Sequence, residues 1–220
     1  VRILEAKKPQ FVLLENVKGM MSKKHRPTLQ KILSELERLG YQIYYDVLNS
    51  KDYGIPQNRE RLWIFATTNK LFDFTFNLNL NKVEPTPHLK SFLDKKPNED
   101  LYKSKEQIDR LIELHKVDFN VKEPACFDVY NKKVRDDRIC ITITEPHHNS
   151  LRIVEPPVNN EFRVRKASVA EQYRLMGFKN GEVKFGDQSY SQLSKRCGNG
   201  WDINLVSMIF NKIFRKANLI

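Results

Sequence analysis

The most constraining feature of this sequence is a predicted β-strand, α-helix and second β-strand near the N-terminus. Residues 11–14 (Phe-Val-Leu-Leu) form a short apolar run, as in strands that are buried on both faces. Residues 27–39 carry apolar side chains at helical spacing, with Pro27 in the first turn and Gly40 just after the end. Residues 41–48 are rich in aromatic and β-branched side chains, which favours a strand. Because βαβ crossovers are right-handed, we expect the two strands to be parallel neighbours in an α/β sheet.

Polar residues follow the first predicted strand at the point where it ends. Glu15 and Asn16 come directly after the apolar run, and the second strand ends near Asn49 at the same edge of the sheet. A loop then leads to a third strand, near residues 59–67, whose first residues lie at this edge if the strand runs antiparallel. Ligands bind at the carboxyl ends of parallel strands in open α/β sheets. This edge is therefore the candidate site.

The third predicted strand adds basic side chains to the same edge. Residues i, i+2 and i+4 share one face of a strand, so we expect Gln57, Arg59 and Arg61 on one face and Glu60 on the other. The two guanidinium groups would then meet the carboxylate of Glu15. Taken singly, such residues are often turn, cap or loop residues. Together, at this spacing, they favour a functional site.

Composition limits the classes of protein that this chain can belong to. Its 220 residues suffice for one large domain or two small ones, and the net charge of +11 modestly favours a nucleic-acid partner. Three cysteines without metal-like spacing argue against a disulfide scaffold and a zinc site. No apolar run is long enough to span a membrane and no signal peptide is visible. We therefore expect no membrane partner and a cytoplasmic location.

Four segments together resemble the DNA (cytosine-5)-methyltransferase family. Residues 14–17 (Leu-Glu-Asn-Val) resemble its Glu-Asn-Val motif, and residues 52–61 (Asp-Tyr-Gly-Ile-Pro-Gln-Asn-Arg-Glu-Arg) resemble its Gln-x-Arg-x-Arg motif. Residues 163–178 resemble the penultimate motif, although Ala170 stands where the family usually has Arg. Residues 190–204 resemble the closing motif, with Gly-Trp in place of its usual small residue and Val.

The resemblance implies a fold and a division into domains. The fold would be α/β: the C-terminal part of a Rossmann-like S-adenosylmethionine-dependent methyltransferase domain, plus a small, irregular target recognition domain. Residues 1–68 would belong to the catalytic domain, residues 69–185 to the target recognition domain, and residues 186–220 would return to the catalytic domain. The middle has little periodicity beyond a helix near 104–115 and a strand near 138–144.

The resemblance also implies an activity and roles for the residues at the candidate site. The activity would be methyl transfer from S-adenosylmethionine to C5 of a cytosine flipped out of double-stranded DNA, as in restriction-modification systems. Glu15 would bind the base near N3. Arg59 and Arg61 would hold the cytosine carbonyl, the glutamate and the phosphate backbone. Asn16 and Gln57 would support them.

Further residues receive roles from the same resemblance. Asn199, in the closing motif, would line the cofactor pocket. Thr142 lies in a Thr-Ile-Thr segment that resembles one approaching the DNA backbone, and Arg165 would also contact DNA. His147 and His148 are more typical of a loop than of a metal site, so no metal is expected.

The nucleophile of the family has no counterpart in this sequence. The family's cysteine lies in a Pro-Cys motif before the Glu-Asn-Val segment, whereas the cysteines here follow Ala125, Ile139 and Arg196. The Gly-rich cofactor motif is also absent, and the chain opens at Val1 in a helix-like stretch. We therefore expect the later portion, or a subunit, of an enzyme that needs an N-terminal methyltransferase portion. The alternative is a catalytically inactive DNA-binding or regulatory remnant, for which a base-holding carboxylate at position 15 would have no use.

Overall fold

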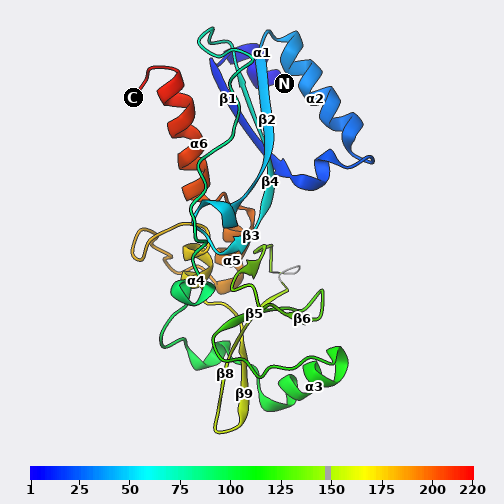
Figure 1. Ribbon diagram of the computed structural model, residues 1–220, viewed down its shortest axis with the longest axis vertical. Coiled ribbons are helices and arrows are strands. Elements are labelled where there is room, and N and C mark those ends of the chain that lie inside the picture. Colours follow the sequence, from blue (N-terminus) through cyan, green and yellow to red (C-terminus); the bar gives the residue numbers. More distant parts are fainter. Residues whose placement is uncertain (147–149) are drawn as a thin grey trace. The chain divides into compact units, whose positions relative to one another are not determined.

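The computed structural model describes residues 1–146 and 150–220, which form two compact units (Figure 1). Unit 1 comprises Val1–Asn49, Glu60–Lys82 and Leu205–Ile220, and unit 2 comprises Ser50–Arg59 and Val83–Asn204. In the described parts of the chain, no helix is long and apolar enough to cross a membrane.

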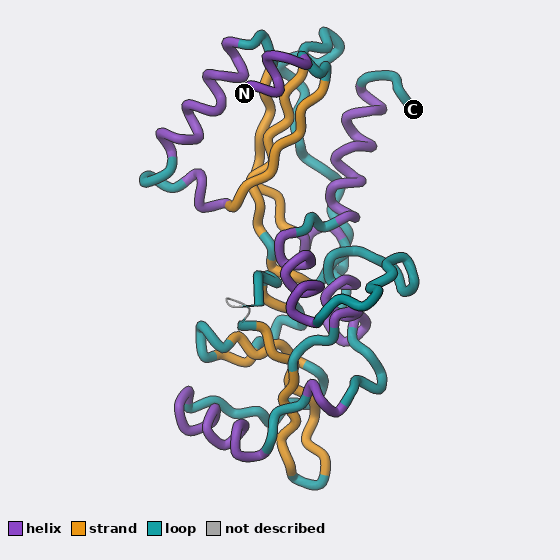
Figure 2. Tube along the Cα trace, turned by 180° about the vertical axis from the view of Figure 1, so that it is seen from behind, coloured by secondary structure: helices purple, strands orange, loops and turns teal. Residues whose placement is uncertain are grey.

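Unit 1 is built on a three-stranded sheet whose order is β1–β4–β2. The strands are β1 (Phe11–Val17), β2 (Gln42–Asn49) and β4 (Glu60–Thr67), and the helices of this part of the chain are α1 (Arg2–Lys7), α2 (Arg26–Arg38), the 3₁₀ turn Lys18–Met21 and α6 (Ile203–Lys216). In both views α2 and α6 lie on opposite sides of the sheet (Figures 1 and 2). The three predicted strands and the predicted helix between the first two are confirmed.

The predicted order of these strands is wrong in one respect. β1 and β2 are parallel, but they are not neighbours, because β4 lies between them and pairs antiparallel with both. Thr67, for example, pairs with Phe11 on one side and with Gln42 on the other. β4 is also the most buried strand of this sheet: Leu62 and Phe65 are fully buried. A strand that is apolar on both faces gains most in the central position, where both faces and both edges are covered.

The two faces of this sheet carry different cores. On one face, apolar residues of the strands pack against Leu29 and Leu36 of α2. On the other face, an aromatic cluster joins the strands to the segment that follows β4; its rings come from Phe11, Tyr44, Phe65, Phe72 and Phe76. The ring centroids of Phe65 and Phe72 are 5.1 Å apart, within the range of favourable aromatic pairs.

Unit 2 contains a four-stranded antiparallel sheet of order β6–β5–β8–β9. Its strands are β5 (Ala125–Asp128), β6 (Lys133–Val134), β8 (Leu151–Val158) and β9 (Glu161–Arg165); β3 (Gln57–Asn58) pairs parallel with β7 (Cys140–Ile141) in a separate ladder. The helices are α3 (Lys105–His115), α4 (Val169–Arg174), α5 (Tyr190–Asn199) and the 3₁₀ turns Ser50–Tyr53, Leu89–Phe92 and Glu99–Leu101. One face of the sheet packs on α3, and the other packs towards α4 and α5.

The capping residues of unit 2 agree with the sequence analysis, while the strands do so only in part. Ser168 and Glu171 form the predicted capping box at the start of α4. The strand predicted near residues 138–144 is reduced to the two residues of β7, because its partner β3 is itself only two residues long. The four-stranded sheet was not predicted.

The borders of the two units differ from the predicted domain boundaries at residues 68/69 and 185/186. Residues 69–82 belong to unit 1, because Phe72 and Phe76 pack on its sheet. Residues 50–59 and the whole of α5 belong to unit 2. The chain therefore enters unit 2 twice.

Candidate active site

Glu15 and Arg61 form an ion pair on one face of the sheet in unit 1. Val17 pairs with Arg61 and Glu15 with Trp63, so both side chains leave the same face of neighbouring antiparallel strands. Arg61 Nε donates to Glu15 Oε1 at 2.9 Å, and the two side chains are only 15% and 19% exposed. Burial lowers the pKa of Arg61, and the charge of Glu15 and the hydrogen bond to it oppose this shift. The carboxylate is thus held by a charged hydrogen bond in a largely desolvated setting.

The neighbours of this pair follow the alternation of the strands. Glu60 points the other way, as predicted, and forms an exposed ion pair of 2.8 Å with Lys18. Asn16 alternates with Glu15, and its Oδ1 accepts a hydrogen bond from the backbone N–H of Val17 at 2.9 Å. The backbone carbonyl of Glu60 accepts a 2.8 Å hydrogen bond from Arg61 Nη1, which fixes the guanidinium further.

Arg59 lies inside unit 2 and is 3% exposed. Its Nη1 donates to the carbonyl of Ile143 at 3.0 Å, and its Nη2 donates to the carbonyls of Gly198 and Gly200 at 3.2 and 2.8 Å. The strand periodicity that grouped Arg59 with Arg61 did not predict these contacts. They give the guanidinium of Arg59 a clear structural task, which is to join three segments of unit 2.

Gln57 performs a parallel task beside Arg59. Its side chain is fully buried, and Nε2 donates to the carbonyl of Leu175 at 2.6 Å while Oε1 accepts from the N–H of Ile143 at 3.0 Å. Buried amides need such partners, because an unpaired polar group costs free energy in the interior. Gln57 and Arg59 therefore tie residues 57–59 to Ile143, to the end of α4 and to the closing glycines.

The closing segment packs against the Thr-Ile-Thr segment through a glycine. A Cβ on Gly198 would lie 2.5 Å from the carbonyl carbon and oxygen of Thr144, so a larger residue does not fit. The next residue, Asn199, is exposed, and its Nδ2 donates to Glu145 Oε1 at 3.0 Å. The predicted cofactor role of Asn199 remains a prediction.

Arg165 is fully buried in unit 2, and its predicted contact with DNA remains a prediction. Its Nη1 and Nη2 donate to the two carboxylate oxygens of Glu171 at 2.7 and 2.8 Å, and its Nε donates to Glu155 at 2.6 Å. Burial alone would lower the pKa of Arg165, but the hydrogen bonds and charges of Glu171 and Glu155 raise it. The register of β9, in which Arg165 pairs with Ile153, places it on the inner face.

Thr142 lines a groove of about 700 Å³ in unit 2. Its hydroxyl donates to the carbonyl of Asn58 at 2.7 Å, and Arg135 and Arg152 line the same groove.

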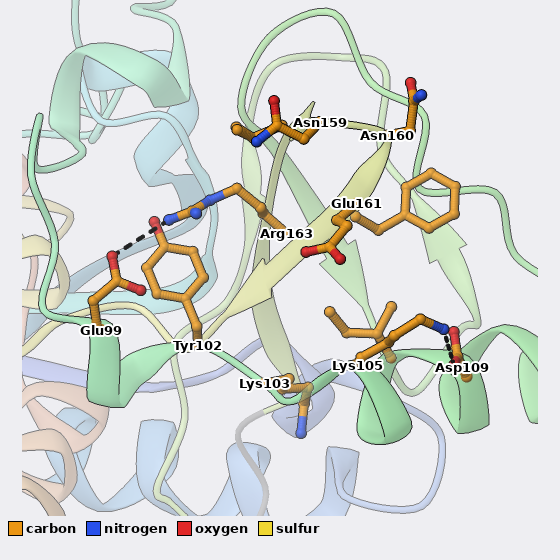
Figure 3. Close-up of a pocket in the computed structure, with 12 residues that line it drawn as sticks. Glu99, Tyr102, Lys103, Lys105, Asp109, Asn159, Asn160, Glu161 and Arg163 are labelled. Atoms are coloured by element: carbon orange, nitrogen blue, oxygen red, sulfur yellow. Dashed lines mark hydrogen bonds and ion pairs between the residues drawn. The ribbon is translucent and has the colours of Figure 1, made fainter.

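A smaller hollow of about 480 Å³ lies beside β9 (Figure 3). There, the guanidinium of Arg163 lies 4.1 Å from the ring centroid of Tyr102.

None of the three cysteines has the chemistry of a nucleophile near neutral pH. Burial raises the pKa of Cys126 and of Cys197 to about 12, and it raises the pKa of Cys140 well above its ordinary value. A buried thiol with a raised pKa is not a thiolate at pH 7 and is unreactive. Among the described residues, no group of His, Cys, Asp or Glu could hold a metal ion; His147 and His148 lie outside them.

Comparison with known proteins places the chain in a family. The model of the C-5 cytosine-specific DNA methylases matches residues 1–215. The chain belongs to this family.

Its relatives include type II methyltransferases. M2.ScrFI of Lactococcus lactis subsp. cremoris is 28% identical over 223 residues, which cover 97% of this chain and 57% of that protein. M.HaeII of Haemophilus aegyptius is 29% identical over 223 residues, covering 99% of this chain and 64% of that protein. The chain thus spans 57–64% of the length of these relatives.

Solved structures share the fold of this family member. The crystal structure of the S. pombe Dnmt2 methyltransferase has a TM-score of 0.69 at 19% identity, over 96% of this chain and 68% of that one. A putative DNA modification methyltransferase encoded within an E. coli prophage has a TM-score of 0.67 at 17% identity, over 99% and 72%. This chain therefore shares the α/β fold of these two methyltransferase structures.

Proposed function

We propose that the chain is the C-terminal portion of a type II cytosine-5 methyltransferase that acts on a specific site in double-stranded DNA. It would transfer a methyl group from S-adenosylmethionine to C5 of a flipped-out cytosine, together with an N-terminal portion that carries the nucleophilic cysteine. The family match over residues 1–215 supports this proposal. The observation that carries it at the level of chemistry is the partly buried pair of Glu15 and Arg61.

The proposed chemistry explains why a carboxylate in this setting is useful. C5 of cytosine is a poor nucleophile until a thiolate adds at C6, so covalent catalysis divides one difficult step into two easier ones. Glu15 would contact the base near N3 and oppose the loss of a proton there. Arg61 would orient the carboxylate and balance its charge, because its Nε is already bound to Oε1 in the structure. Desolvation of the pair strengthens both effects.

Arg59 and Gln57, the two other polar residues of this motif, would position the chain around them and would not contact the base. Arg59 and Gln57 bind backbone groups of unit 2, so we assign them the task of holding residues 57–59 rather than direct contact with the base. S-Adenosylmethionine, when bound, supplies the methyl group. The exposed amide of Asn199 suits one polar contact to it, and one amide is far from a complete cofactor site.

A second candidate function is a DNA-binding or regulatory remnant without catalytic activity. The buried, protonated cysteines favour this second function, because none of them can serve as the nucleophile. The pair of Glu15 and Arg61 favours the enzyme, because a binding module gains nothing from placing a carboxylate at a DNA-facing edge.

Replacing Glu15 by Gln separates these two functions. In the enzyme completed with its N-terminal portion, Glu15→Gln removes the charge but keeps the shape, so the loss should fall on the chemical step. We expect single-turnover methylation to slow by at least roughly 100-fold, the scale of a general acid–base contact. Duplex affinity should change little, because Glu15 does not attract phosphates.

Glu60→Gln is the matched control, because Glu60 lies on the opposite face of the strand and forms an exposed ion pair with Lys18. It should methylate at the parental rate. A thermal melt of each variant separates lost chemistry from lost folding. Parental rates for a folded Glu15→Gln enzyme would contradict the proposed role of Glu15.

A further inference from the structure

Three cationic side chains gather on one face of the four-stranded sheet in unit 2: Lys103, Arg152 and Lys166. β8 and β9 pair Ile153 with Arg165, so the preceding Arg152 and the following Lys166 lie opposite each other and share the other face. The segment before α3 adds a further strand-like edge, where the N–H of Lys103 donates to the carbonyl of Val164 at 2.9 Å. Alternation along these segments puts all three cations on the face that also carries Val154 and Val164.

The three positive charges influence one another. Burial lowers the pKa of Lys103, and the neighbouring charges of Arg152 and Lys166 lower it further. Burial also lowers the pKa of Arg152. Like charges at short range in a partly desolvated place raise the free energy of the folded chain. A bound anion would offset this cost.

The side chain of Tyr190 lies beside Lys166 and Arg152 and is held in place by hydrogen bonds. Lys166 Nζ lies 5.7 Å from the centroid of its ring, and the charge of Arg152 interacts with its hydroxyl. The hydroxyl donates to the carbonyl of Ala167 and accepts from Gln172 Nε2, both at 3.0 Å. Arg152 is itself anchored, because its Nη1 donates to the carbonyl of Leu151 at 2.7 Å. Arg152 and Tyr190 therefore have little side-chain entropy left to lose when an anion binds.

We propose that Lys103, Arg152 and Lys166 form an anion-binding strip that takes a phosphate of the DNA backbone. The assignment rests on the proposed function, which supplies duplex DNA as the polyanion. Arg152 connects the strip with the groove that Thr142 lines, so a DNA strand in that groove would bring its phosphates to the strip. Such contacts position the duplex without reading its sequence.

The salt dependence of duplex binding tests this strip directly. For the parent chain and for Lys103→Gln, Lys166→Gln and the double variant, duplex affinity is measured at several salt concentrations. Each phosphate contact that is lost should lower the slope of log affinity against log salt by about one, to the same extent for different duplex sequences. The matched control is Lys105→Gln, because Lys105 is exposed and already paired with Asp109 at 2.7 Å. It should keep the parental slope.

A second measurement uses inorganic phosphate as the probe. Phosphate should raise the melting temperature of the parent chain above that in chloride of equal ionic strength, and the double variant should lose this gain. If the folded double variant binds duplex with parental affinity and slope, the DNA assignment is overturned, even if phosphate alone still acts through the strip. Such a result would leave the proposed function standing, whereas a parent chain without duplex binding would overturn both.

Discussion

At the scale of single residues, similar side chains of neighbouring motif positions have different tasks. Arg61 holds the carboxylate of Glu15, while Arg59, two positions earlier, binds the carbonyls of Ile143, Gly198 and Gly200. The first arrangement suits a role in the reaction, and the second suits a role in holding the fold together. The alternation of side chains along β1 and β4, together with the pairing of these two strands, explains the pair of Glu15 and Arg61. It could not reveal the partners of Arg59, because they lie far along the chain and depend on tertiary folding.

The cysteines provide a prediction at this scale. Because burial raises the pKa of Cys126 and Cys197 to about 12, the native thiols should react very slowly with iodoacetamide at pH 8. Unfolding in urea should release ordinary reactivity. Between the ordinary pKa near 9 and the raised value near 12, the folded chain keeps protons that the unfolded chain loses, so stability should fall as the pH rises through this window.

Alkylation followed by mass spectrometry, with and without urea, measures this reactivity. Fast labelling of any of the three cysteines in the folded chain at pH 8 would contradict the burial described here. It would also reopen the question of a nucleophile within this chain.

At the scale of secondary structure, local signals predicted helices better than strands. The turn at Gly40, where φ is +85°, and the capping box of Ser168 end and begin helices as expected, because such signals need only near neighbours. The hairpin of β8 and β9 was missed, since Pro156 and Pro157 interrupt its apolar alternation. Asn159 and Asn160, both with positive φ, are a turn signal between the two strands that could have revealed it.

The buried ion pair between β9 and α4 carries a prediction at this scale. Arg165→Met would leave the carboxylate of Glu171 buried without its bidentate partner, and such losses cost about 3–5 kcal/mol. We therefore expect a marked drop in the urea midpoint of unit 2. The fraction of this variant that remains folded should bind duplex DNA with an unchanged salt slope, because Arg165 is fully buried.

The adjacent Lys166 is the matched comparison, because it is exposed and belongs to the proposed strip. Lys166→Gln should alter the salt slope with little effect on stability. If Arg165→Met instead left stability intact and lowered the salt slope, the buried position of Arg165 would be wrong and the predicted contact of Arg165 with DNA would be supported.

At the scale of the whole molecule, the family motifs are distributed over two units. Glu15 and Arg61 belong to unit 1, whereas Gln57, Arg59 and the closing glycines belong to unit 2. The sequence predicted this family from motifs at both ends of the chain, and the family match over residues 1–215 confirms it. The unit borders could not be predicted, because they depend on the packing of Phe72, Phe76 and α5 and not on local pattern.

The central claim is that this chain supplies Glu15 and Arg61 to a methyltransferase whose nucleophile comes from an N-terminal portion. Its most direct test is incorporation of labelled methyl groups from S-adenosylmethionine into duplex DNA by this chain, by an N-terminal portion carrying the Pro-Cys motif, and by both together. We predict background incorporation with either portion and turnover with both, because the thiols of this chain are buried and protonated. Robust turnover by this chain alone, or none by the two folded portions combined, would contradict the account.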